Sequence, residues 1–380
     1  MKSFARILRC CVVVGISAAL AAQGVSVTSS KGVPILVRQH AVTLDALQRG
    51  ANLGVPGYVV ESLWLGAYNY AVGERTVDLA RNEVLEVSRE RIRFRTMDDR
   101  ELWSVARALV RVQARSASTH RLLFDTRIVL PRAGGGLVAL HRTTGAVAWE
   151  QPDAPSECFA HDAELVFVAG GDKKSPTLAA FAWRNGARAF LTPLQNRAVR
   201  IVPGDYGVAV LHDGGAVVFD RAGPKLFNVA TPLLDLHPVP QAAVHKGHDA
   251  KRSVAWYARS KDAVHAWDSM GVEQWGVPMI RNDVECLSVT ATGDLVVAEY
   301  CNFSDSGFTA TCFDRSSGDV LWRRRQPGLM VDHSKYRHRL YVQPVGERLL
   351  FVSQASAGDF VVALRSADGG QLGREEWPRR

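Results

Sequence analysis

Two eleven-residue stretches decide the fold: residues 139–149 read ALHRTTGAVAW, and residues 312–322 read CFDRSSGDVLW. In each stretch a short apolar segment leads into a turn with a glycine, and a tryptophan follows the glycine by four residues. Glycine suits such a turn because it adopts a positive φ without a steric penalty. The pattern predicts a tight strand–turn–strand unit whose second strand carries an aromatic side chain.

The same step from turn to aromatic recurs along the chain at Gly186 to Phe190, Gly223 to Phe227 and Gly271 to Trp275, with Asp99 in place of glycine before Trp103. Successive aromatics are 37 to 48 residues apart, which is the length of one four-stranded propeller blade. A last copy, residues 363–369, keeps the turn but has Gly373 where the aromatic is expected.

One blade cannot cover both of its faces, so we expect each aromatic to dock into the next blade. A buried tryptophan or phenylalanine contributes a large apolar area there, and an indole N–H can also donate to a backbone carbonyl. The predicted docking residues are Trp103, Trp149, Phe190, Phe227, Trp275 and Trp322. Short apolar stretches between the copies, such as residues 127–130 and 165–168, are typical of strands.

The two clear copies resemble the A-L-D-A-x-T-G-x-x-x-W docking motif of the PQQ-like (quinoprotein alcohol dehydrogenase-like) propeller repeats. Together with the weaker copies, the resemblance covers roughly residues 91–380. It implies an all-β fold, a β-propeller of four-stranded blades, with eight blades favoured and seven possible. A strand from the N-terminal region is expected to pair with the last blade and close the ring.

The N-terminus has the layout of a secretory signal peptide, which we assign to residues 1–21. Lys2, Arg6 and Arg9 precede an apolar run at residues 10–20, which is too short to span a bilayer. We therefore expect no transmembrane anchor. Cys10 and Cys11 stand at the start of that run, not just after it, so we expect no lipid anchor either. Residues 22–380 then form a single propeller domain, exported to the periplasm or the extracellular space, with a net charge reduced from +8 to +5.

The resemblance leaves two classes of function open. Quinone-dependent dehydrogenases of this family are larger and need acidic Ca²⁺ ligands, an aspartate base and often a vicinal disulfide. The adjacent pair Cys10 and Cys11 falls within the predicted signal peptide. The resemblance is therefore closer to the non-catalytic outer-membrane-assembly scaffold type, which implies protein or polymer partners docked by interblade loops. We expect no cofactor and no catalytic residues; the alternative is a PQQ-dependent or other propeller-based enzyme.

A polar loop holds a candidate metal site at His245, His248 and Asp249, with His237 nearby. Two imidazoles and a carboxylate are ligands that suit Zn²⁺. The alternative is a solvated loop whose histidines bind nothing.

Four cysteines remain after removal of the signal peptide, and an exported chain allows them to oxidise. A two-residue hairpin turn at residues 306–307 would place Cys301 opposite Cys312, which predicts a contact and a disulfide between them. Cys286 could compete for the same partner. The alternative is that these small residues pack within one blade without a bond.

Arg323, Arg324 and Arg325 form a basic run, and Lys335, Arg337 and Arg339 follow it. Such a cluster could face an anionic partner, either lipid head groups or an acidic protein. The alternative is a solvated charged face. Few aromatics interleave with these cations and a signal peptide precedes the chain, so we do not expect nucleic acid as a partner.

Overall fold

The computed structural model describes most of the chain after residue 23. The described residues are 24–29, 34–37, 57–65, 70–78, 83–87, 91–96, 99–106, 122–123, 126–132, 134–172, 174–241, 253–279, 284–300, 307–328, 339–345, 347–355 and 358–378. The predicted signal peptide, residues 1–21, lies outside them. Its assignment and the single domain over residues 22–380 therefore stay predictions.

The regular elements of the described residues are β-strands, which form seven antiparallel sheets. The first sheet has seven strands in the order β2-β1-β3-β4-β5-β6-β7. Its members are β1 (Gly24–Ser29), β2 (Pro34–Val37), β3 (Gly57–Leu65), β4 (Tyr70–Asp78), β5 (Glu83–Val87), β6 (Arg91–Thr96) and β7 (Glu101–Ala106).

Each of the other six sheets contains four strands that are consecutive in the chain. The second and third sheets consist of β8 (Leu122–Leu123), β9 (Arg127–Pro131), β10 (Leu137–His141), β11 (Val147–Gln151), β12 (Cys158–His161), β13 (Leu165–Asp172), β14 (Ser175–Ala182) and β15 (Arg188–Pro193). The fourth and fifth consist of β16 (Arg200–Gly204), β17 (Gly207–His212), β18 (Gly215–Phe219), β19 (Lys225–Val229), β20 (Asp235–Pro238), β21 (Val254–Arg259), β22 (Ala263–Asp268) and β23 (Glu273–Pro278). The last two consist of β24 (Val284–Val289), β25 (Leu295–Tyr300), β26 (Phe308–Phe313), β27 (Val320–Gln326), β28 (Arg339–Val345), β29 (Arg348–Ala355), β30 (Gly358–Arg365) and β31 (Gln371–Pro378).

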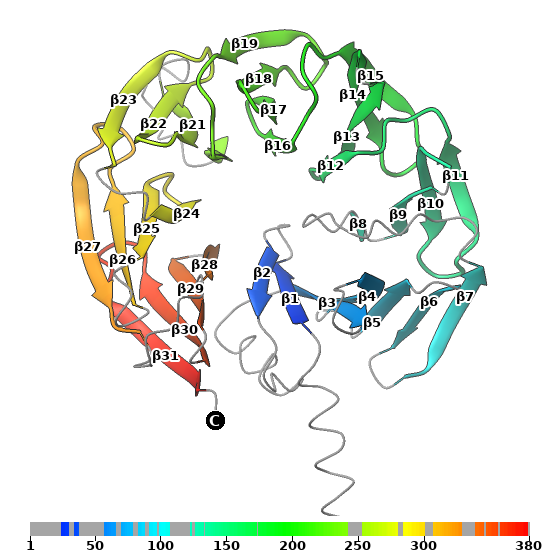
Figure 1. Ribbon diagram of the computed structural model, residues 1–380, viewed down its shortest axis with the longest axis horizontal. Coiled ribbons are helices and arrows are strands. Elements are labelled where there is room, and N and C mark those ends of the chain that lie inside the picture. Colours follow the sequence, from blue (N-terminus) through cyan, green and yellow to red (C-terminus); the bar gives the residue numbers. More distant parts are fainter. Residues whose placement is uncertain are drawn as a thin grey trace, which may run out of the picture.

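The sheets are arranged as blades around a centre, so the chain is an all-β propeller (Figure 1). The first strand of a blade lies near the centre, as β12, β16 and β28 show, and its fourth strand lies at the outer rim, as β11, β23 and β27 show (Figure 1). Neighbouring first strands contact one another from β12 through β16, β20 and β24 to β28.

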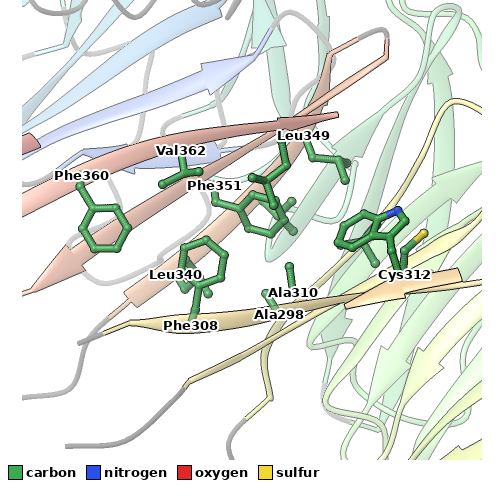
Figure 2. Packing of buried hydrophobic residues seen from close by; sticks show 13 residues of the cluster. Ala298, Phe308, Ala310, Cys312, Leu340, Leu349, Phe351, Phe360 and Val362 are labelled. Atoms are coloured by element: carbon green, nitrogen blue, oxygen red, sulfur yellow. The ribbon is translucent and has the colours of Figure 1, made fainter. Parts of the chain in front are cut away.

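The middle strands of a blade are apolar because buried side chains of neighbouring blades pack against their faces. In β13, for example, the five residues from Val166 to Gly170 are all buried. Figure 2 shows one such layer, in which Phe308 of β26 meets Phe351 of β29 and Phe360 of β30. The ring centroids of Phe308 and Phe351 lie 4.8 Å apart, within the range of favourable aromatic pairs.

The turn between the last two strands of a blade has the same backbone conformation in successive blades, with one residue at a positive φ. Gly145, in the clearest copy, has a φ of 70°, and Asp99 takes the same value where the sequence lacks glycine. A β-bulge precedes the turn, between Ala139 and Leu140 in one blade and between Cys312 and Phe313 in another. The repeat therefore fixes where the fourth strand begins relative to the third.

The closure of the ring differs from the prediction. The last sheet contains only β28 to β31 among the described strands, so no N-terminal strand extends it. Strands β1 and β2 are instead hydrogen-bonded within the first sheet, and β2 lies next to β28 and β29. The described strands form seven sheets, and an eighth separate blade stays a prediction.

Candidate binding surface at the inner strands

The six predicted docking aromatics lie on the last strand of six successive sheets, and each lies against the turn of the next sheet. A Cβ atom added to Gly145 would come within 2.5 Å of the Trp103 ring, and one added to Gly318 within 2.8 Å of the Trp275 ring. Only glycine leaves room for such a contact. The other pairs are Trp149 with Gly186, Phe190 with Gly223, Phe227 with Gly271, and Trp322 with Gly369.

Each docking tryptophan also donates a hydrogen bond to the neighbouring blade. Trp103 Nε1 lies 2.7 Å from the Arg142 carbonyl oxygen, and Trp322 Nε1 lies 2.8 Å from that of Ser366. Trp149 and Trp275 make the equivalent bonds to Trp183 and Arg315. Apolar contact and a directional bond thus act together between blades, which makes the propeller a rigid frame.

Two buried arginines in the docking turns stabilise the fold rather than line a binding site. Arg142 is 3% exposed, and its Nε donates to Glu83 Oε2 at 2.8 Å. Arg315 is 9% exposed, and its guanidinium donates to Ser253 Oγ and to the Val254 carbonyl. Both side chains reach back to the preceding blade, so each guanidinium group is bonded between two blades and does not face a ligand.

The predicted metal site lies outside the described residues, since His245, His248 and Asp249 fall between Gln241 and Ser253. The described part of the chain holds no group of three His, Cys, Asp or Glu residues that could bind a metal. His237, expected near the site, lies on β20, and its Nε2 is 2.8 Å from Asp235 Oδ2.

The predicted register around the cysteines is wrong. Strands β25 and β26 pair with Val296 opposite Cys312 and Tyr300 opposite Phe308, so position 301 cannot stand opposite position 312. Cys312 is a buried free thiol, and burial raises its pKa to about 12. Cys301 lies outside the described residues, and the predicted two-residue turn fails because the segment joining the two strands is longer.

The basic run lies on β27, the outermost strand of its blade, where Arg323, Arg324 and Arg325 are all exposed. Lys335 and Arg337 lie outside the described residues. The described part of the chain contains no helix with the length and apolar character needed to cross a membrane.

A surface that the sequence did not predict lies where the chain enters two neighbouring first strands. Val199 precedes β16 and is 62% exposed, and Leu234 precedes β20 and is 58% exposed. Their backbones are fixed, because Val199 N donates to the Leu211 carbonyl at 2.8 Å and Leu234 N to that of Arg259 at 2.7 Å. The two aliphatic side chains therefore occupy equivalent positions in adjacent blades.

Charged side chains flank this aliphatic pair. Arg200 forms an ion pair with Asp235, and Arg197 Nε lies 2.9 Å from Glu157 Oε2. The arginines are the more exposed partners: Arg200 is 49% exposed against 19% for Asp235. We call Arg197, Val199, Arg200, Leu234 and Asp235 the inner-strand patch; it presents guanidinium groups beside two aliphatic side chains.

Asp235 is held ionised at the base of the inner-strand patch. Burial disfavours its charge, but His237 and Arg200 outweigh burial and hold the pKa of Asp235 well below its usual range. The carboxylate thus keeps Arg200 in place at neutral pH. Burial, with a smaller contribution from the Glu157 carboxylate and against the effect of Arg197, raises the pKa of the Cys158 thiol to about 11, and this thiol donates to the Ala198 carbonyl.

The sequence did contain a signal for the inner-strand patch. Val199-Arg200 and Leu234-Asp235 each place an aliphatic residue directly before a charged one, at the start of a blade. An apolar residue at a strand start is normally assigned to the core. Only the arrangement of the blades shows that these two side chains face solvent.

The comparisons with known proteins agree with this architecture. Residues 88–232 match the family model PQQ_2, described as outer membrane protein assembly factor BamB. This part of the chain is therefore similar to the PQQ-like propeller repeats. The chain has no significant match among curated proteins.

Among solved structures, the computationally designed Ika8 protein is 13% identical, with a TM-score of 0.50 over 77% of this chain and 84% of that one. BamB from Moraxella catarrhalis is 15% identical over 84% and 83% of the two chains, with a TM-score of 0.37. Quinohemoprotein alcohol dehydrogenase ADHIIG from Pseudomonas putida HK5 is 10% identical over 78% and 65%, with a TM-score of 0.43. At these identities the likeness to the designed protein concerns the fold alone.

Proposed function

We propose that the chain is a non-catalytic binding scaffold of the cell envelope, which recruits a protein partner through the inner-strand patch. The observation that carries the proposal is the pair Val199 and Leu234. Both are more than half exposed although the backbone around them is fixed by hydrogen bonds. Protein interfaces commonly combine an aliphatic or aromatic centre with arginine and a polar rim.

The position of the inner-strand patch supports a role in docking. Its residues Arg197, Val199 and Leu234 lie on the segments that join the outer strand of one blade to the inner strand of the next, residues 194–199 and 230–234, and Arg200 and Asp235 begin the inner strands. Loops on a rigid frame are the usual carriers of binding function. A partner that contacts both segments would be held by two adjacent blades at once, without any movement of the frame.

The family description supports the cell envelope as the setting. The family that residues 88–232 match is described as an assembly factor of outer membrane proteins. A signal peptide at residues 1–21, as predicted from the sequence, would bring the chain to the same compartment. By this likeness we expect a protein partner in the envelope.

The test is capture of a partner from envelope extract by the wild type and by two matched variants. V199E/L234E places two carboxylates in the inner-strand patch, while M270E/V272E does the same in the turn between β22 and β23, at the opposite end of the strands. Met270 and Val272 are 60% and 57% exposed, so the two variants are comparable. We expect V199E/L234E to lose a partner that the wild type and M270E/V272E both retain.

Two results would contradict this proposal. One is equal capture by all three proteins, which would remove the inner-strand patch from the interface. The other is a quinone-specific change in absorbance when the purified chain is titrated with PQQ and Ca²⁺, which would support the enzymatic alternative.

A further inference from the structure

The outer edge of one blade carries a second exposed surface, on β27. Val320 and Leu321 at the start of this strand are 57% and 49% exposed, and the side chain of Arg323 is 65% exposed. Arg324 and Arg325, which follow, are exposed as well. We call these five residues the arginine rim; Figure 1 shows β27 at the outside of the ring.

The docking residue Trp322 fixes the arginine rim. It is 5% exposed, and its Nε1 donates to the Ser366 carbonyl of the next blade. Because side chains alternate along a strand, Leu321, Arg323 and Arg325 project to one side and Arg324 to the other. Leu321, Arg323 and Arg325 are therefore presented together on one face of a strand that Trp322 anchors to the next blade.

Arg324 extends the arginine rim onto the neighbouring blade. Its aliphatic stem lies over Gly369, and its guanidinium donates to the Asp368 carbonyl at 3.1 Å. Two further exposed side chains follow there: Arg365, which is 50% exposed and pairs with Asp368 at 2.8 Å, and Leu372, which is 45% exposed. Cationic and aliphatic groups thus continue across the boundary between two blades.

The charge of the arginine rim is positive. The segment from Val320 to Gln326 contains three arginines and no carboxylate. Glu299 approaches Arg323 at 3.5 Å, a long ion pair, and Asp319 lies at the turn end of the strand, beyond Val320. The whole chain also carries a net charge of +8, or +5 without the predicted signal peptide. An anionic partner is therefore favoured at this edge.

The combination of groups points to the kind of partner. Guanidinium groups bind phosphates, and aliphatic side chains beside them can enter the boundary between head groups and acyl chains. These exposed side chains lie on the outermost strand of the blade, where they can meet a broad surface. We propose that the arginine rim binds the surface of membranes that contain anionic phospholipids, peripherally and in a salt-dependent way. This inference is independent of the inner-strand patch.

The experiment is co-sedimentation of the purified chain with vesicles of phosphatidylcholine containing about one third phosphatidylglycerol, and with vesicles of phosphatidylcholine alone. A basic residue near an anionic surface strengthens binding about fivefold, so R323Q/R325Q should weaken it about 25-fold. The matched control is R188Q/K225Q, which removes two exposed cations from β15 and β19, the outer strands of other blades. We expect the control to stay within about twofold to threefold of the wild type.

The salt dependence of the wild type gives a second readout that needs no variant. We expect binding at about 20 mM salt and its loss near 0.5 M, where the Debye length falls to a few ångström. Equal weakening by both double variants, or salt-independent binding, would overturn the proposal. Binding to soluble polyglutamate but not to anionic vesicles would identify an acidic protein partner and would overturn it as well.

Discussion

Replacing Gly318 with alanine tests whether the contact between glycine and aromatic stabilises the ring. Gly318 has a φ of 76°, and a Cβ atom there would lie 2.8 Å from Cδ2 of Trp275. A left-handed backbone costs alanine about 1 kcal/mol, and an extra methyl group in a packed contact costs about 1–3 kcal/mol. We expect G318A to lower the free energy of unfolding by about 2–4 kcal/mol, which for a chain of this length corresponds to about 3–5 °C in melting temperature.

Two further variants separate the backbone cost from the clash. Gly134 has a φ of 83°, but its nearest neighbour to an added Cβ, Arg132 Nη1, is 4.0 Å away, so G134A should cost about 1 kcal/mol. Removing the Trp275 ring should reduce the cost of G318A to the same value. Thermal unfolding followed by circular dichroism measures all of these. A cost for G318A equal to that of G134A, or one that W275A leaves unchanged, would refute the docking role.

The remaining predictions concern a hydrogen bond, an acid and a thiol. W322F should destabilise the chain by about 1–2 kcal/mol in chemical unfolding, because the Ser366 carbonyl loses its donor; an unchanged midpoint would show that the bond is dispensable. Because the pKa of Asp235 is lowered on folding, its ionisation stabilises the fold fully above the unfolded value of about 4, and this stabilisation is lost progressively as the pH falls from there through the lowered pKa of the folded state. D235N should therefore flatten the acid limb of stability against pH, and an identical limb in the variant would argue against this. The Cys312 thiol, with its pKa raised to about 12 by burial, should react with iodoacetamide only after unfolding; rapid modification of the folded chain would contradict its burial.

The blades could be predicted because each one repeats a local signal. Gly145 in the turn and the aromatic Trp149 are four residues apart. That spacing alone predicts the position of the turn and the side chain that docks on the next blade. Each copy is weak by itself, as Asp99 shows by standing where glycine is usual. The regular recurrence of the copies carries the prediction, because one blade needs the next to cover its face.

The closure and the cysteine register could not be predicted, since both depend on distant segments. The pairing of Cys312 with Val296 follows from the length of the segment that joins β25 to β26, and the sequence offered a shorter turn. The N-terminal strands were expected to extend the last blade. They are already paired within the first sheet, and that preference depends on long-range contacts rather than on local pattern.

The inner-strand patch lies at positions where the backbone, and not the side chain, stabilises the repeat. At the entrance to successive blades, Glu157, Val199 and Leu234 each donate their backbone N–H to the second strand, at the Ala169, Leu211 and Arg259 carbonyls. The repeat therefore fixes the backbone at this position in every one of these blades, whereas the side chain contributes little to the fold. The docking aromatics are constrained in the opposite way, because their side chains hold the ring together and are mostly covered. A propeller can accordingly change its partner at the blade entrances with little loss of stability, and this supports the proposal that the two exposed aliphatic residues at such positions serve in binding.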